Sequence, residues 1–175
     1  MIDLLGRLIQ LKLVTDEIDQ HFHNIERWWG STGADTETNA IAATVTVPYS
    51  AVSGDDTWGT AIPICGTGDN PVLDSMTEFD AHRLLVVSLD DQTDAWRVRI
   101  IWGTGTSGAA ITAEQWSEML VISNAVPGNR AGGVPIEVRM RPVDIGTKLW
   151  VQSWNDTLDE VLQFYWGAHG YLYPH

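Results

Sequence analysis

Apolar and polar residues alternate with a period of two over most of this chain, and that pattern limits the folds open to it. The clearest run spans residues 96–102, in which Val98 and Ile100 alternate with Arg97 and Arg99. Successive side chains of a β-strand point to opposite faces, so this run is typical of a strand with one face in a core and one in water. The part of the chain after residue 40 is therefore expected to be mainly β.

Eight segments show strand-like patterns and are separated by stretches rich in Gly, Asp, Asn and Pro, which favour turns. Many short strands punctuated in this way predict a jelly-roll-like β-sandwich over residues 41–175 rather than an open sheet. The expected strands are Ile41–Val47, Trp58–Cys65, Arg83–Leu89, Trp96–Trp102, Trp116–Ile122, Ile136–Arg141, Thr147–Trp154 and Val161–Gly167.

Two of these strands are apolar on both faces, although a sandwich core needs only one face of each. In the strand at 147–154, Leu149 and Val151 share one face; in the strand at 161–167, Phe164 lies on the face opposite Val161. Spare aromatic surface is rarely left in water. The residues expected to form a subunit interface or a ligand platform are Trp150, Trp154 and Tyr165.

The first thirty residues have a different period and predict one long N-terminal α-helix over residues 1–30. Apolar residues recur every seven positions and form a seam of the kind found in coiled coils. The seam favours self-association, although packing onto the chain's own body remains an alternative. The expected oligomerisation residues are Leu4, Leu8, Leu11, Val14, Ile18, His21, Phe22, Ile25 and Trp28. Small polar residues then predict a linker over residues 31–40.

Charge and composition exclude several kinds of partner. The 175 residues carry a formal net charge of −13, so the chain offers no general attraction to nucleic acid or to an anionic membrane. Acidic residues such as Asp16 and Glu17 interrupt the apolar run that a membrane span needs. An early Asp3 and a segment that ends in Trp28 and Trp29 do not fit a secretory signal. The single cysteine, Cys65, is expected to be a buried strand residue.

The motifs associated with chemistry in other proteins lack, in this chain, the context that the chemistry needs. Residues 103–108 match G-x-G-x-x-G, but no βαβ pattern follows, so a hairpin loop is expected there. His82 and His169 have no nucleophile partner visible in the sequence and are interpreted as packed or surface histidines. In a trimer, the three copies of His21 would form a ring. This ring would either bind an ion or act as a polar layer that sets the register of the helices. No active site, metal or cofactor is predicted.

Four segments taken together resemble structural proteins encoded in tailed-bacteriophage genomes, which place an N-terminal helix before a β-rich body. The segments are Phe79–Val86, Arg97–Gly105, Gly146–Val151 and Phe164–Tyr171. The resemblance implies a trimeric decoration or cement protein that is assembled in the host cytoplasm, binds the major capsid protein and lies on the surface of the phage head. The chain departs from the family's pattern at Trp102, Trp150 and Trp166, where smaller or less aromatic residues are expected.

The leading hypothesis is a non-enzymatic viral structural protein that forms a homotrimer through its helix. Isoleucine at seam positions 18 and 25 is compatible with three helices. The alternative is a carbohydrate-binding sandwich, in which exposed Trp and Tyr stack on a surface glycan and acidic loops bind calcium. An enzyme of the cupin type ranks third, because no inward-facing set of His and Glu is visible on the strands.

Overall fold

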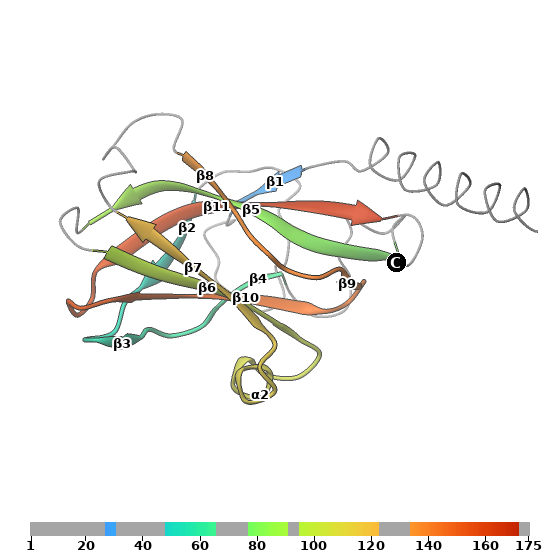
Figure 1. The fold of residues 1–175 in the computed structure, drawn as a ribbon, viewed down its shortest axis with the longest axis horizontal. Helices are drawn as coiled ribbons and strands as arrows, with labels where there is room; N and C mark the ends of the chain where they lie inside the picture. The colour runs from blue at the N-terminus through green and yellow to red at the C-terminus, as the bar shows by residue number, and fades with distance from the viewer. Residues whose placement is uncertain (1–26, 31–47, 66–76, 91–94, 123–133, 172–175) are drawn as a thin grey trace, which may run out of the picture.

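The computed structural model describes residues 27–30, 48–65, 77–90, 95–122 and 134–171, which form a mainly β body. Two antiparallel sheets lie face to face as two layers, with a short helix on the outer side of one of them (Figure 1). The prediction of a mainly β fold is confirmed. Among the described residues, no helix is long and apolar enough to span a membrane.

The six-stranded sheet is built around two long neighbouring strands, β5 and β11. Its main path runs β1-β11-β5-β8, while β2 pairs with β11 and β9 pairs with β5. All of these pairs are antiparallel. The strands are β1 (Arg27–Trp29), β2 (Tyr49–Val52), β5 (Glu78–Leu89), β8 (Val134–Glu137), β9 (Val143–Asp144) and β11 (Val161–Tyr171).

The five-stranded sheet is built around β6 and β10, which pair antiparallel over seven residues of each strand. Its main path runs β3-β10-β6-β7, and β4 pairs with β10. The helix α2 (Ser107–Thr112) connects β6 to β7, and the Thr106 hydroxyl caps it by accepting from the Ala109 N–H. The strands are β3 (Thr57–Trp58), β4 (Ile62–Cys65), β6 (Ala95–Gly103), β7 (Trp116–Ile122) and β10 (Lys148–Asn155).

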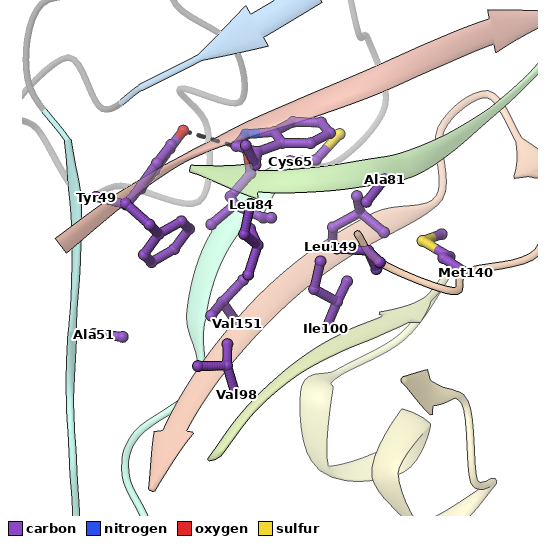
Figure 2. Close-up of a cluster of buried hydrophobic side chains, with 14 of the residues drawn as sticks. Tyr49, Ala51, Cys65, Ala81, Leu84, Val98, Ile100, Met140, Leu149 and Val151 are labelled. Atoms are coloured by element: carbon purple, nitrogen blue, oxygen red, sulfur yellow. Dashed lines mark hydrogen bonds between the residues drawn. The ribbon is translucent and has the colours of Figure 1, made fainter. Parts of the chain in front are cut away.

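The core lies between the two sheets and takes one face of each long strand (Figure 2). Alternation places Val98 and Ile100 of β6 there, together with Phe164 of β11. Burying each large apolar side chain contributes about 1.5–3 kcal/mol, and this is the main term that holds the sheets together. The Tyr49 hydroxyl also donates to the Ile64 carbonyl at 3.3 Å, which joins β2 of one sheet to β4 of the other.

Most of the predicted strands are confirmed. The segments at 96–102, 116–122, 147–154 and 161–167 correspond to β6, β7, β10 and β11, the segment at 83–89 lies within β5, and Cys65 is a buried residue of β4. The segment at 41–47 lies outside the described residues. The segment at 136–141 begins inside β8 but leaves the strand after Glu137.

The predicted strand at 58–65 is instead two short strands, β3 and β4, separated around Gly59. A Cβ atom at position 59 would collide with the carbonyl oxygen of Val52, so the backbone approaches that strand as only glycine permits. The Gly59 N–H donates to the Ser153 carbonyl at 2.9 Å. This close approach turns the chain and interrupts the strand.

The predicted helix over residues 1–30 is wrong at its C-terminal end. Residues 27–29 form β1, which pairs with residues 166–168 of β11, so Trp28 lies in a strand and the sheet begins before residue 41. Aromatic residues favour strands, and β11 offers an edge to pair with there. The linker at 31–40 and the remaining seam residues, Leu4, Leu8, Leu11, Val14, Ile18, His21, Phe22 and Ile25, lie outside the described residues.

Candidate functional site

The outer face of the five-stranded sheet carries an unusual set of side chains. Because Val98 and Ile100 of β6 point into the core, Arg97 and Arg99 point away from it. In the register of the sheet, Trp154 of β10 lies opposite Arg97, and Gln152 lies opposite Arg99. Directly opposed residues of antiparallel strands share a face, so two strands place arginine, tryptophan and glutamine side by side.

The neighbouring strands β3 and β7 complete this surface with Trp58 and Trp116. The Arg99 Cζ lies 4.3 Å from the centre of the Trp58 ring and 5.5 Å from that of Trp116. The Arg97 Cζ lies 5.4 Å from the Trp58 ring and 5.5 Å from the Trp154 ring. We call these five residues, Trp58, Arg97, Arg99, Trp116 and Trp154, the Trp/Arg face. Its three indole rings are all partly exposed.

Hydrogen bonds hold the arginines of the Trp/Arg face in position. The Arg99 Nε donates to Gln152 Oε1 at 2.8 Å, and Gln152 Nε2 donates to the Gly59 carbonyl at 2.7 Å. The Arg97 Nε donates to Glu118 Oε1 at 2.7 Å. Each guanidinium is therefore fixed on one edge by an acceptor and stacked between aromatic rings, an arrangement that suits arginine better than lysine.

The two arginines have different electrostatic surroundings. Burial lowers the pKa of Arg99, while nearby Glu118 raises it and Arg97 lowers it again. A guanidinium keeps its proton despite such shifts. The Trp/Arg face is thus a patch that places two fixed cations, one of them paired with Glu118, on a chain whose formal charge is −13.

The three residues predicted to form one platform do not lie together. Leu149 and Val151 join the main core as expected, but Trp150 is only 4% exposed because α2 covers it with Ala110. The assignment of Trp150 to an exposed platform is therefore wrong. Trp154 lies on the Trp/Arg face, whereas Tyr165 lies on β11 in the other sheet.

Sequence reasoning missed most of the Trp/Arg face. The strand patterns give no role to Trp58 or Trp116, although Trp58 contacts both arginines and Trp116 contacts Arg99, each from a different strand. The alternation at residues 96–102 already placed Arg97 and Arg99 on the wet side of their strand. Aromatic residues on the outer faces of the other strands were the signal that could have identified the remaining residues of the Trp/Arg face.

The glycine motif at residues 103–108 begins the connection of a β-hairpin, as expected, because β6 and β7 pair antiparallel, but the connection also contains a helix. The strand β6 ends at Gly103, and α2 begins four residues later at Ser107. The helix then packs Ala110 against Ile101 and Trp150 on the outside of the sheet. The segment therefore covers an apolar part of the outer face, next to the Trp/Arg face.

His82 and His169, which the sequence suggested were packed or surface histidines, are in contact with each other. The rings of His82 on β5 and His169 on β11 stack with their centres 3.9 Å apart, and Asp80 lies beside them. Among the described residues, these three form a group whose ligand atoms could surround one metal ion. A polar pocket elsewhere, lined in part by Glu78, Arg141 and Asp144, has charges of both signs.

Comparison of the chain with protein-family models, curated proteins and solved structures found no match.

Proposed function

We propose that this chain is a non-enzymatic structural protein of a virus particle, a homotrimer with a jelly-roll-like sandwich that attaches to the major capsid protein on a phage head. The observation that carries the proposal is the Trp/Arg face. The resemblance of four segments to tailed-bacteriophage structural proteins supplies the biological setting.

The chemistry of the Trp/Arg face suits a protein partner. Tryptophan and arginine are the residue types that most often dominate the binding energy of protein interfaces. Hydrogen bonds to Gln152 and Glu118 already hold Arg99 and Arg97, so less side-chain entropy is lost when a partner binds. Two fixed cations favour a partner surface that presents carboxylates or aromatic rings.

Glycan binding is the alternative function for the same surface. Partly exposed tryptophans can stack on sugar rings, and three of them share this face. However, the guanidinium groups of Arg97 and Arg99 already lie over these indole rings. A sugar would have to use the remaining ring surface, whereas a protein would contact the arginines and the rings together. The geometry favours the protein partner.

A binding assay with variants of Trp154 tests the proposal. Trp154→Ala is expected to weaken binding to heads of the parent virus that lack this protein by at least tenfold, since an interface tryptophan of this kind contributes about 2 kcal/mol or more. Co-sedimentation over a range of protein concentrations measures the affinity.

Leu158→Ala is the matched control for Trp154→Ala, because Leu158 is an exposed apolar residue outside the Trp/Arg face. It should bind heads as tightly as the unchanged protein. Equal affinities for the two variants would reject the Trp/Arg face as the capsid contact. A glycan array run with and without a chelator addresses the alternative, and saturable sugar binding that Trp154→Ala abolishes would favour it.

The homotrimer is tested by the mass of the full chain in solution. Light scattering should give three times the chain mass, and Ile18→Asp should shift the protein toward monomer, because each buried carboxylate would lack a partner. Gln20→Asp adds the same charge off the seam and should leave the mass unchanged. A monomeric full chain, or an Ile18→Asp protein of unchanged mass, would end the trimer proposal.

A further inference from the structure

The side chains of Asp80, His82 and His169 meet on the outer face of the six-stranded sheet because of the local strand pairing. Asp80 of β5 and His169 of β11 are paired directly, so both side chains lie on the same face. The register shifts between Gly167 and Ala168, which are paired with Arg83 and Ala81. This β-bulge leaves His82 without a partner in the register, and bulges commonly redirect a side chain.

The distances within this group suit shared ligation of one ion. One ligand atom from each of the three residues lies within 4.8 Å of the others. The His169 Nδ1 and Asp80 Oδ1 are 3.8 Å apart. Ligands of a tetrahedral zinc ion, at about 2.0–2.1 Å from the metal, are about 3.3–3.5 Å apart. Small side-chain rotations would therefore bring the three atoms to coordinating distance.

Asp80 supplies a second observation that points to a cation. Its side chain has one oxygen, Oδ2, that accepts a hydrogen bond from the Tyr171 hydroxyl at 2.7 Å. The other oxygen, Oδ1, is buried and has no hydrogen bond among the described residues. A buried carboxylate oxygen without a donor costs free energy. A metal ion next to the two histidines would compensate for the missing donor.

Tyr171 is placed to orient the carboxylate. Its hydroxyl donates to Asp80 Oδ2, and a tyrosine hydroxyl is a protonated donor at neutral pH. By holding Oδ2, it leaves Oδ1 directed toward the histidines. Groups that hold metal ligands in this way usually contribute to affinity without touching the ion.

We propose that Asp80, His82 and His169 bind a divalent transition-metal ion such as Zn²⁺, with Tyr171 as the residue that positions Asp80. Two imidazoles and one carboxylate suit zinc and its neighbours, whereas calcium and magnesium prefer oxygen ligands throughout. Both histidines are partly exposed, so the ion is reached from solvent and keeps a position for water or a fourth ligand.

The bound ion would cross-link β5 and β11, the two longest strands of the six-stranded sheet. A ligand that binds only the folded chain raises its stability by mass action. Zinc should therefore raise the midpoint of thermal unfolding. The site lies in the other sheet from the Trp/Arg face, so this inference does not depend on the proposed capsid contact.

Isothermal titration of the full-length protein, first stripped with a chelator and dialysed, tests the site with Zn²⁺. We expect saturable binding of one ion per chain at the cluster, a higher unfolding midpoint with Zn²⁺, and no such increase with Ca²⁺. The chain has five histidines, and they divide into two test sets. His82→Gln with His169→Gln should weaken this binding at least 100-fold, whereas His21→Gln, His23→Gln and His175→Gln together should retain it.

Tyr171→Phe separates positioning from ligation. This variant keeps all three ligands and should weaken zinc binding about tenfold, as expected for loss of a group that orients a ligand. Visible absorption of the Co²⁺-loaded protein provides a readout that does not rely on stability, and its bands should vanish in the variant lacking His82 and His169. The proposal would be overturned if the unchanged protein showed no saturable zinc binding, or if the variant lacking His82 and His169 bound zinc as tightly as the unchanged protein.

Discussion

Replacing Phe164 with alanine is expected to lower the free energy of unfolding by about 3–5 kcal/mol, the usual cost of removing a fully buried aromatic side chain. Phe164 is completely buried on β11, which pairs with three other strands of its sheet. Its ring stacks on Tyr49 with the ring centres 5.7 Å apart. The substitution would remove this contact and leave a cavity between the sheets.

Urea denaturation of the full chain, followed by tryptophan fluorescence, measures the effect of Phe164→Ala. Leu158→Ala is a suitable control because Leu158 is 57% exposed and should change stability by less than about 0.5 kcal/mol. A loss below about 1 kcal/mol for Phe164→Ala would contradict the described packing of β11 against the opposite sheet.

Arg99→Ala is expected to lower the free energy of unfolding by about 2–3 kcal/mol, although Arg99 lies on the outer face of its sheet. Arg99 is only 8% exposed and has its guanidinium stacked over Trp58. Its removal takes away the donor to Gln152 Oε1, and a buried acceptor left unpaired costs about 1–3 kcal/mol. The lost stacking and the lost packing of the arginine stem add to this.

Arg97→Ala is the matched control for Arg99→Ala. The Arg97 side chain is 41% exposed, and its ion pair with Glu118 is the kind that contributes about 1 kcal/mol or less. Arg99→Lys keeps the charge but loses the Nε donor and the flat stacking surface. Its loss of unfolding free energy should therefore lie between the losses of Arg97→Ala and Arg99→Ala. Equal costs for Arg97→Ala and Arg99→Ala would contradict the buried role of Arg99.

The positions of the strands were largely readable from the sequence. The run at 116–122 coincides with β7, and the alternation at 96–102 predicted which side chains of β6 enter the core. This succeeds because the side-chain direction in a strand is a local property of the backbone. The same local reasoning failed at Arg27–Trp29, where pairing with β11 overrides the helical pattern that precedes it.

The candidate sites depended on contacts between distant parts of the chain. Trp150 and Trp154 look equivalent in the sequence, yet α2 buries Trp150 while Trp154 stays on the Trp/Arg face. Likewise, the pattern around His82 contains no sign of the β-bulge that brings it against His169. No period or motif encodes which surface a connecting helix will cover.

The sequence alone determined that the body is mainly β, most strand positions and the division of β6 into a core face and a wet face, because alternation acts through neighbouring residues. Only the tertiary structure decided that Trp58, Trp116 and Trp154 surround two arginines and that Asp80, His82 and His169 meet. Those groupings depend on strand order, register and one bulge, which the whole set of long-range hydrogen bonds and core contacts selects together.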